Sequence, residues 1–206
     1  MTLYFANPNS DGAREAMRDH RLGFIRTPVQ GNARPEGAIW CADNGCFGKG
    51  YPGDEGWIEW LSSLDPEGCR FATAPDVVGD AAATLERSAP FYEVIRSLGF
   101  PAALVAQDGL EDLAVPWDRI DALFIGGTTD WKMGPEAALL VKEARRRGKY
   151  VHFGRVNSFK RYKYAHEIGC HSVDGTYLVF GPKVNLPRLL GWVDKIRACC
   201  PGPTHW

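Results

Sequence analysis

The chain has 206 residues, of which 45% are hydrophobic, and a formal net charge of −1 at pH 7. This length and composition suit one globular domain with a continuous core. The near-zero charge excludes bulk attraction to a polyanion, so nucleic-acid binding requires a local basic patch. No apolar run approaches the ~18 residues that span a bilayer, so we expect a cytoplasmic protein with no membrane partner.

Six cysteines occur at irregular spacings, without a C-x₂-C pair and without a signal peptide before them. This pattern predicts reduced thiols rather than a disulfide framework, and it predicts no structural metal site. No cofactor is expected. The tail at 199–206 contains two cysteines and a histidine, which are metal ligands, but its place at the end of the chain favours a frayed terminus over a metal site.

In chain order, short apolar runs alternate with helix-like stretches. Apolar runs bounded by turn residues are typical of strands that are buried on both faces. Eight such runs occur, at 3–6, 24–27, 38–42, 70–73, 103–106, 122–125, 150–153 and 171–173. Apolar spacing and terminal residues predict helices over 81–98, 135–147, 158–168 and 186–198.

Eight strands alternating with helices favour an α/β fold, a compact (β/α)8 TIM-like barrel formed by residues 1–198 as a single domain. About 250 residues are typical of this fold, so the loops must be short. An open doubly wound sheet is the alternative. The segment 30–37 is rich in turn residues and is expected to be a mobile loop near the site.

In parallel α/β barrels the active site lies on the loops that follow the carboxyl ends of the strands, here called the rim. Polar residues or glycines follow each of the eight apolar runs, whereas the opposite ends carry ordinary turn residues. The rim residues are Asn7, Gln30, Asp43-Asn44-Gly45, Asp76, Gln107-Asp108-Gly109, Gly126-Gly127, Arg155-Val156-Asn157 and Asp174-Gly175. This asymmetry predicts a functional site on the rim.

Two of the rim carboxylates, Asp43 and Asp174, are candidates for a general acid/base and a nucleophile. Aspartate beside glycine is also common in turns, but the joint placement of the two favours function. Asp76 either points into the pocket or caps the next helix. Gln107 either reads the edge of a planar heterocycle or caps a helix. Gly126-Gly127 either allows close approach of a ligand or forms a plain turn.

A basic and aromatic segment follows the seventh run. Lys160, Arg161 and Lys163 alternate with tyrosines, shortly after Arg155 and Asn157. Such a segment can hold a phosphate backbone and stack a base, which predicts a nucleic-acid contact. A solvated helix face is the alternative.

Five elements in this order resemble the tRNA-guanine transglycosylase superfamily, especially its short phage and bacterial members that act on DNA. They are Asp43-Asn44-Gly45-Cys46-Phe47, Asp76, Ala106-Gln107-Asp108-Gly109, Gly126-Gly127-Thr128 and Ser172-Val173-Asp174-Gly175-Thr176. Cys46 and Asp108 depart from the family pattern, and its zinc cluster and tRNA-docking insertions are absent. DNA is therefore favoured over tRNA as the nucleic-acid partner.

The resemblance implies an enzyme of a bacterial cell or its phage that replaces guanine in a nucleic acid with a 7-deazaguanine such as preQ0. It implies Asp174 as the nucleophile that forms a covalent glycosyl intermediate and Asp43 as the general acid/base. The free base is the second substrate. The expected substrate contacts are Asp76, Gln107, Gly126, Gly127, Phe47, Asn44, Arg155 and Asn157.

Two other functions fit the same rim. In an N-glycosidase, water takes the sugar and the base is released. A non-catalytic nucleotide-binding subunit would recruit a partner, although the presence of both Asp43 and Asp174 disfavours a degenerate barrel. A homodimer or a partner subunit is left open as the assembly.

Overall fold

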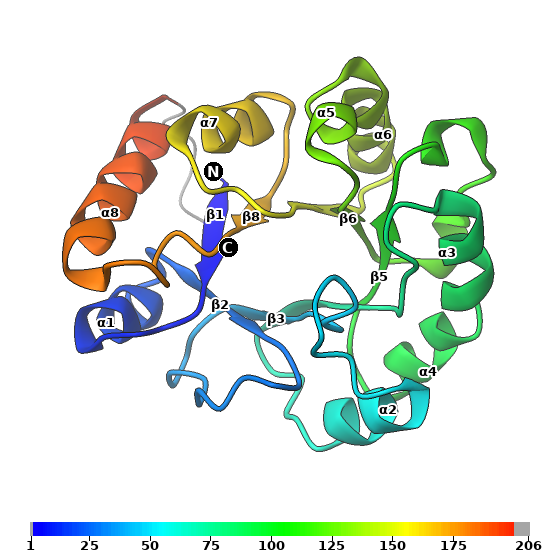
Figure 1. The fold of residues 1–206 in the computed structure, drawn as a ribbon, viewed down its shortest axis with the longest axis horizontal. Helices are drawn as coiled ribbons and strands as arrows, with labels where there is room; N and C mark the ends of the chain where they lie inside the picture. Colours follow the sequence, from blue (N-terminus) through cyan, green and yellow to red (C-terminus); the bar gives the residue numbers. More distant parts are fainter. Residues whose placement is uncertain (1, 200–206) are drawn as a thin grey trace.

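A computed structural model, which describes residues 2–199, is a closed barrel of eight parallel strands in sequence order (Figure 1). The strands are β1 Leu3–Ala6, β2 Gly23–Arg26, β3 Trp40–Ala42, β4 Cys69–Thr73, β5 Ala102–Ala106, β6 Ala122–Ile125, β7 Tyr150–Phe153 and β8 Ser172–Asp174. The predicted (β/α)8 barrel is confirmed, and the open doubly wound sheet is wrong. Residues 200–206 of the predicted tail lie outside the described part of the chain.

Helices form the layer around the barrel (Figure 1). They are α1 Asp11–Arg18, α2 Asp54–Ser62, α3 Ala81–Ser88, α4 Phe91–Ser97, α5 Thr129–Lys132, α6 Pro135–Arg146, α7 Phe159–Glu167 and α8 Pro182–Cys199. Two 3-10 turns, Leu110–Asp112 and Trp117–Arg119, replace a helix between β5 and β6, which shortens the chain. Within residues 2–199, no helix has both the length and the apolarity needed to cross a membrane.

The helix predicted over 81–98 is two helices in the structure, α3 and α4. Pro90 lies between them as the N-cap of α4. Proline lacks a backbone N–H, and its ring clashes with the preceding turn, so a helix does not continue through it. The other predicted helices correspond to α6, α7 and α8, while α1, α2 and α5 were not predicted.

Several helices begin at a side-chain cap on the rim. Ser10, Asp80, Thr128 and Ser158 each accept a hydrogen bond from the backbone N–H three residues later, at the starts of α1, α3, α5 and α7. These bonds satisfy N–H groups that have no partner within the helix. The caps therefore fix where each rim loop ends.

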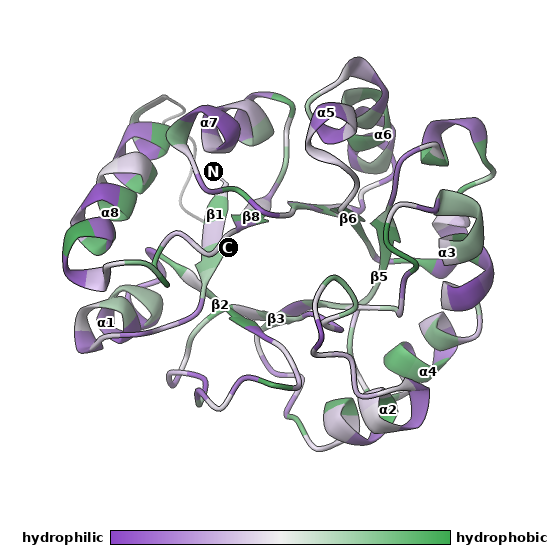
Figure 2. Cartoon of the chain, in the orientation of Figure 1, coloured by the Kyte–Doolittle hydropathy of each residue, from purple (hydrophilic) through white to green (hydrophobic). Residues whose placement is uncertain are grey.

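The core has two layers because strand side chains point alternately into the barrel and toward the helices. In Figure 2 the strands are largely hydrophobic, while the helices carry both hydrophobic and hydrophilic residues. The layer inside the barrel consists of Leu3, Phe5, Ile25, Ile39, Cys41, Phe71, Ala103, Val105, Ala122 and Phe124. A larger layer of buried apolar side chains lies between the strands and the helices.

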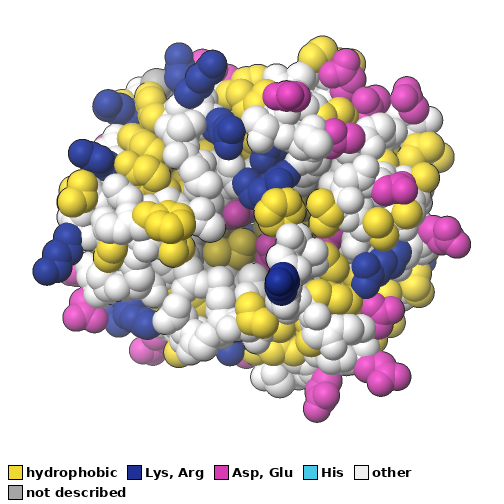
Figure 3. Space-filling view, in the orientation of Figure 1, with side chains coloured by type: hydrophobic (Ala, Val, Ile, Leu, Met, Phe, Trp, Pro, Cys, Tyr) yellow, Lys and Arg dark blue, Asp and Glu magenta, His cyan; other side chains and the backbone are white. Residues whose placement is uncertain are grey.

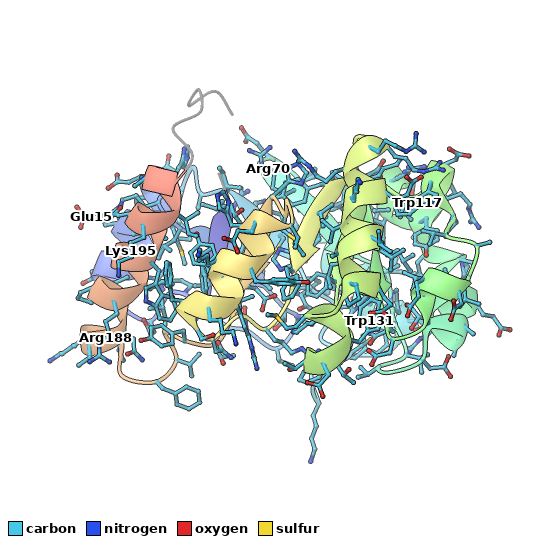
Figure 4. All side chains as sticks on the ribbon, turned by 90° about the horizontal axis from the view of Figure 1, so that it is seen from above. Glu15, Arg70, Trp117, Trp131, Arg188 and Lys195 are labelled. Atoms are coloured by element: carbon cyan, nitrogen blue, oxygen red, sulfur yellow. The ribbon has the colours of Figure 1, made fainter. Side chains whose placement is uncertain are left out.

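The two ends of the barrel are distinguished by the residues labelled in Figure 4. Trp131 and Arg188, which lie on helices that follow strand ends, are at one end of the molecule, and Arg70 and Trp117 are at the other. The first end is the rim. The view in Figure 1 looks onto it.

Gly23 at the start of β2 makes room for an aromatic ring inside the barrel. A Cβ atom at this position would lie 2.2 Å from Cδ1 of Phe5. In contrast, a Cβ atom on Gly191 of α8 would meet no atom within 4 Å. The two glycines therefore offer a matched pair of substitutions.

We expect Gly23→Ala to lower the free energy of unfolding by ~1–3 kcal/mol, because the methyl group forces Phe5 out of its place. We expect Gly191→Ala to raise it by up to about 1 kcal/mol, because alanine favours a helix over glycine. Urea unfolding of both variants measures the difference. Equal stabilities of the two variants would contradict this account of the barrel interior.

Candidate active site

The carboxyl ends of the strands surround a cavity of about 440 Å³. Figure 3 shows acidic side chains in the hollow near the centre of this face and basic side chains beside it. Strands β3 to β8 and their loops supply the walls, whereas the loop at 30–37 does not line the cavity. The lining residues are Asp43, Asn44, Phe47, Thr73, Asp76, Val105, Gln107, Phe124, Gly126, Thr129, Arg155, Asn157, Arg161, Asp174, Gly175 and Thr176.

Asp43 follows β3 and is a partly exposed wall residue. Its Oδ1 accepts a hydrogen bond from the backbone N–H of Gly45 at 2.8 Å. Gly45 has φ +79°, a left-handed conformation that glycine adopts without strain. Removal from water raises the pKa of Asp43 to about 7, the Gly45 bond opposes the rise, and the nearby carboxyls of Asp174 and Asp76 add to it. Asp43 can therefore give or take a proton near neutral pH.

Asp174 at the end of β8 is fixed by a buried imidazole. His152 Nε2 lies 2.9 Å from Asp174 Oδ1, and His152 Nδ1 lies 2.7 Å from Ser172 Oγ. The backbone N–H of Arg155 also donates to Asp174 Oδ1, at 3.3 Å. Both contacts are on one oxygen, which leaves Oδ2 without a hydrogen-bond partner among residues 2–199.

His152 was missed in the sequence because it lies within an apolar run. Its ring is surrounded by three phenylalanines inside the barrel, with centroid distances of 5.7 Å to Phe5, 5.0 Å to Phe71 and 4.6 Å to Phe124. A polar residue at an inward position of a barrel strand was the available signal. The layer inside the barrel therefore supports Asp174 directly.

Asp76 lies in the cavity wall and holds two predicted contact residues. Its Oδ1 accepts from Asn44 Nδ2 at 3.0 Å, and its Oδ2 accepts from Gln107 Nε2 at 2.7 Å. Gln107 Oε1 in turn accepts from the Gly79 backbone N–H at 3.1 Å. Burial raises the pKa of Asp76, while the amide hydrogen bonds oppose the rise. These side chains connect the ends of β3, β4 and β5, and Asp80 serves as the cap of α3.

Arg155 spans the mouth of the cavity. Its guanidinium group donates to the carbonyls of Gly126, at 2.7 Å, and Gly127, and its Cζ lies 4.3 Å from the ring centroid of the exposed Phe47. Arg155 has φ +60°, which is unusual for a residue other than glycine and costs conformational energy. In this conformation the backbone N–H of Arg155 donates a hydrogen bond to Asp174.

The predicted basic segment is divided between the cavity and the outer surface. Arg161 lines the cavity, as does Asn157. Lys160 and Lys163 are exposed and are not part of the lining, and Lys163 pairs with Glu167 at 3.4 Å. The structure therefore brings Arg161 to the predicted site without the two lysines.

Lys132 of α5 was also missed. It is fully buried, and its Nζ donates to the Gly154 carbonyl at 2.6 Å, next to Arg155. Burial lowers the pKa of Lys132 to about 7. Lys132 does not line the cavity. Its hydrogen bond to Gly154 instead supports, from outside the cavity, the turn that carries Arg155.

The sequence matches no family model and no curated protein. Solved structures share the fold at low identity. The 3-hexulose-6-phosphate synthase of Salmonella typhimurium is 13% identical with a TM-score of 0.51, over 97% of this chain and 99% of that chain. KGPDC from Streptococcus mutans is 11% identical with a TM-score of 0.55, over 97% and 98%. The HpcH/HpaI aldolase of Desulfitobacterium hafniense is 14% identical with a TM-score of 0.51, over 95% and 93%.

These comparisons correct the sequence interpretation. Two of these structures are named as a synthase and an aldolase, and none of the three is named as a transglycosylase, so the resemblance to tRNA-guanine transglycosylases and the base exchange through an Asp174 glycosyl intermediate are wrong. The structure gives a physical reason, because the amides expected to read a base are already bonded within the protein. Gln107 is bonded to Asp76 and Gly79, and Asn44 is bonded to Asp76 and to the Ala74 carbonyl.

We expect the Asp43 carboxyl to titrate with a midpoint near pH 7, because burial disfavours its ionised form. The ¹³C NMR signal of the carboxyl group, assigned by its absence in Asp43→Asn, measures this directly. A midpoint near the ordinary value of 3.8 would contradict the described environment.

The same pKa makes folding depend on pH. Folding raises the pKa of Asp43, so the folded state favours the protonated carboxyl. The stability that this protonation contributes is fully present below about pH 4 and is lost as the pH rises through about 7. Relative to Asp43→Asn, the wild-type free energy of unfolding should fall by up to about 4 kcal/mol between pH 4 and pH 8. If the free energies of unfolding of the wild type and of Asp43→Asn, measured in urea, depend on pH in the same way, this contribution of Asp43 is ruled out.

Proposed function

We propose that the chain is an enzyme that breaks or forms a carbon–carbon bond next to a carbonyl group in a small substrate. The observation that carries this proposal is Asp43, whose pKa of about 7 suits proton transfer, on the wall of a cavity that also contains two guanidinium groups. A cavity of about 440 Å³ has the size of a small-molecule site.

In the cleavage direction, the substrate is a β-hydroxy carbonyl compound and Asp43 acts first as a base. Its carboxylate takes the proton of the β-hydroxyl group as the bond between the α and β carbons breaks. The electron pair of that bond moves to the carbonyl group and gives an enolate, and the β carbon leaves as a second carbonyl product. Asp43 then returns its proton to the α carbon. Synthesis is the reverse sequence.

The negative charge on the enolate oxygen needs a fixed positive group. Arg155 supplies one, because the carbonyls of Gly126 and Gly127 hold its guanidinium in place at the cavity wall. A group that is oriented before the reaction stabilises the developing charge without reorganisation. Asp174 lies beside this position, and its Oδ2 can accept a hydrogen bond from a second hydroxyl group of the substrate, other than the β-hydroxyl.

The comparisons support the proposal only through the fold. An aldolase and a synthase are among the structures with this barrel, and they are at most 14% identical to the chain. The choice of Asp43 as the base therefore depends on its own environment.

The test is ¹H NMR of a panel of small β-hydroxy ketones and β-hydroxy keto acids, free and phosphorylated, incubated with the protein in D₂O. Cleavage gives two new carbonyl products. Return of the proton from Asp43 places solvent deuterium on the α carbon. If no compound of the panel is cleaved and none takes up deuterium, the proposal is contradicted.

On a compound that reacts, we expect Asp43→Asn to lower kcat by about 10²-fold or more, because the base is removed. Asp80→Asn is the matched control, since Asp80 lies on the same rim as a helix cap and asparagine caps equally well. The wild-type kcat/KM should rise with a midpoint near pH 7, where Asp43 becomes ionised. A wild-type rate in Asp43→Asn would exclude Asp43 as the base.

A further inference from the structure

The cavity wall has an acidic side and a basic side. Asp43 and Asp76 follow β3 and β4, while Arg155 and Arg161 come after β7, on the opposite side of the eight-strand barrel. Within residues 2–199, neither guanidinium group has a carboxylate within ion-pair distance. Buried or half-buried charges are normally paired. Asp174 lies near Arg155 and accepts a hydrogen bond from its backbone N–H, but neither guanidinium group is neutralised by direct contact with a carboxylate of the described residues.

The guanidinium group of Arg161 makes fewer contacts with the protein than that of Arg155. It lies in the first turn of α7 and is half-buried. The contact of its guanidinium group is with the Arg155 carbonyl, at 3.4 Å. A guanidinium group has five N–H donors, so most of the hydrogen-bonding capacity of Arg161 remains for a ligand in the cavity.

The loop after β8 adds polar groups to the same cavity wall as Arg161 and Asp174. Gly175 lies against the loop after β7: a Cβ atom here would be 2.3 Å from the Val156 carbonyl oxygen and 2.6 Å from Asn157 Oδ1. This close approach brings Thr176 Oγ1 to 3.5 Å from Asn157 Oδ1. Gly175, Thr176 and Asn157 all line the cavity. The side of β7 and β8 thus combines two guanidinium groups, a hydroxyl and an amide with the carboxylate of Asp174, which His152 and the Arg155 backbone hold by its Oδ1.

We propose that this basic side binds a phosphate monoester group of the substrate, with Arg161 as the main ligand, Arg155 as the second charge and Thr176 as a hydroxyl donor. Arg161 has N–H donors left for the phosphate oxygens, and Arg155, whose guanidinium group is held by two backbone carbonyls, adds a second positive charge, so the pair matches the two negative charges of a phosphate monoester. The inference rests on the proposed function and names its substrate class, a phosphorylated carbonyl compound.

This placement orients the substrate. The phosphate lies on the side of β7 and β8, and the carbon chain extends across the cavity toward Asp43. In this placement the guanidinium group of Arg155, held by the Gly126 carbonyl, lies between the enolate oxygen and the phosphate, beside Asp174.

Binding of inorganic phosphate is the direct test. Thermal unfolding and isothermal titration calorimetry are run at constant ionic strength, with sodium chloride replacing phosphate in the reference. We expect saturable phosphate binding that raises the unfolding temperature of the wild type. In Arg161→Gln the affinity should fall by about tenfold or more, because a charge-assisted hydrogen bond is lost. Lys163→Gln, on the outer surface of the same helix, should bind like the wild type.

Acetate and malonate distinguish a carboxylate site from a phosphate site. If either binds as tightly as phosphate, the assignment to a phosphate monoester is wrong. Absence of saturable phosphate binding, or equal binding by wild type and Arg161→Gln, also overturns it.

Asp43→Asn separates this inference from the proposed function. This variant should still bind phosphate, because Asp43 is on the acidic side of the cavity. If the wild type binds phosphate but neither breaks nor forms carbon–carbon bonds, only the proposed function is contradicted. Carbon–carbon chemistry without phosphate binding would remove the phosphate site alone.

Discussion

The last strand hydrogen-bonds to the first with Leu3 opposite Ser172, Tyr4 opposite Val173 and Phe5 opposite Asp174, and this pairing closes the barrel. Closure leaves no free sheet edge, so every strand has a partner on both sides. It also brings strand ends from the two halves of the chain to one rim. Asp43 and Asp174 face the same cavity only because the sheet returns to its beginning.

A closed barrel has an interior that must be filled, and here the filling also serves the site. Phe5, Phe71 and Phe124 surround His152, and His152 orients Asp174 above them. The carboxyl on the rim and the aromatic layer beneath it are parts of one packed unit. A change in the volume of this layer is therefore transmitted to the position of the Asp174 oxygen atoms.

The sequence predicts the architecture well because strands buried on both faces appear as short apolar runs, and all eight of them are strands in the structure. The rule that strand ends form the site then places Asp43, Asp76, Gln107 and Asp174 correctly on the cavity wall. The single helix predicted over 81–98 is wrong, because Pro90 divides this segment into α3 and α4. His152 is a polar residue within an apolar run, and its role follows only from its contacts with Asp174 and Ser172 on the neighbouring strand.

The function could not be read in the same way. Segments such as Asp43-Asn44-Gly45 and Gly126-Gly127 are turn residues that a barrel rim needs for its own loops, so their order along the chain does not specify a substrate. Which partner each side chain selects depends on distances across neighbouring strands. Gln107 bonds to Asp76 from the adjacent strand, and no local pattern in the sequence records that contact.

The bonded set of Asn44, Asp76 and Gln107 has a consequence for how such a barrel can diverge. These side chains satisfy one another and fasten three strand ends together, so a substitution in any of them disturbs the other two. Across the cavity, Asn157 and Thr176 are exposed and make few contacts with the protein. Inherited changes of specificity should therefore accumulate in the loops after β7 and β8, while the β3–β5 sector is kept as a constant frame.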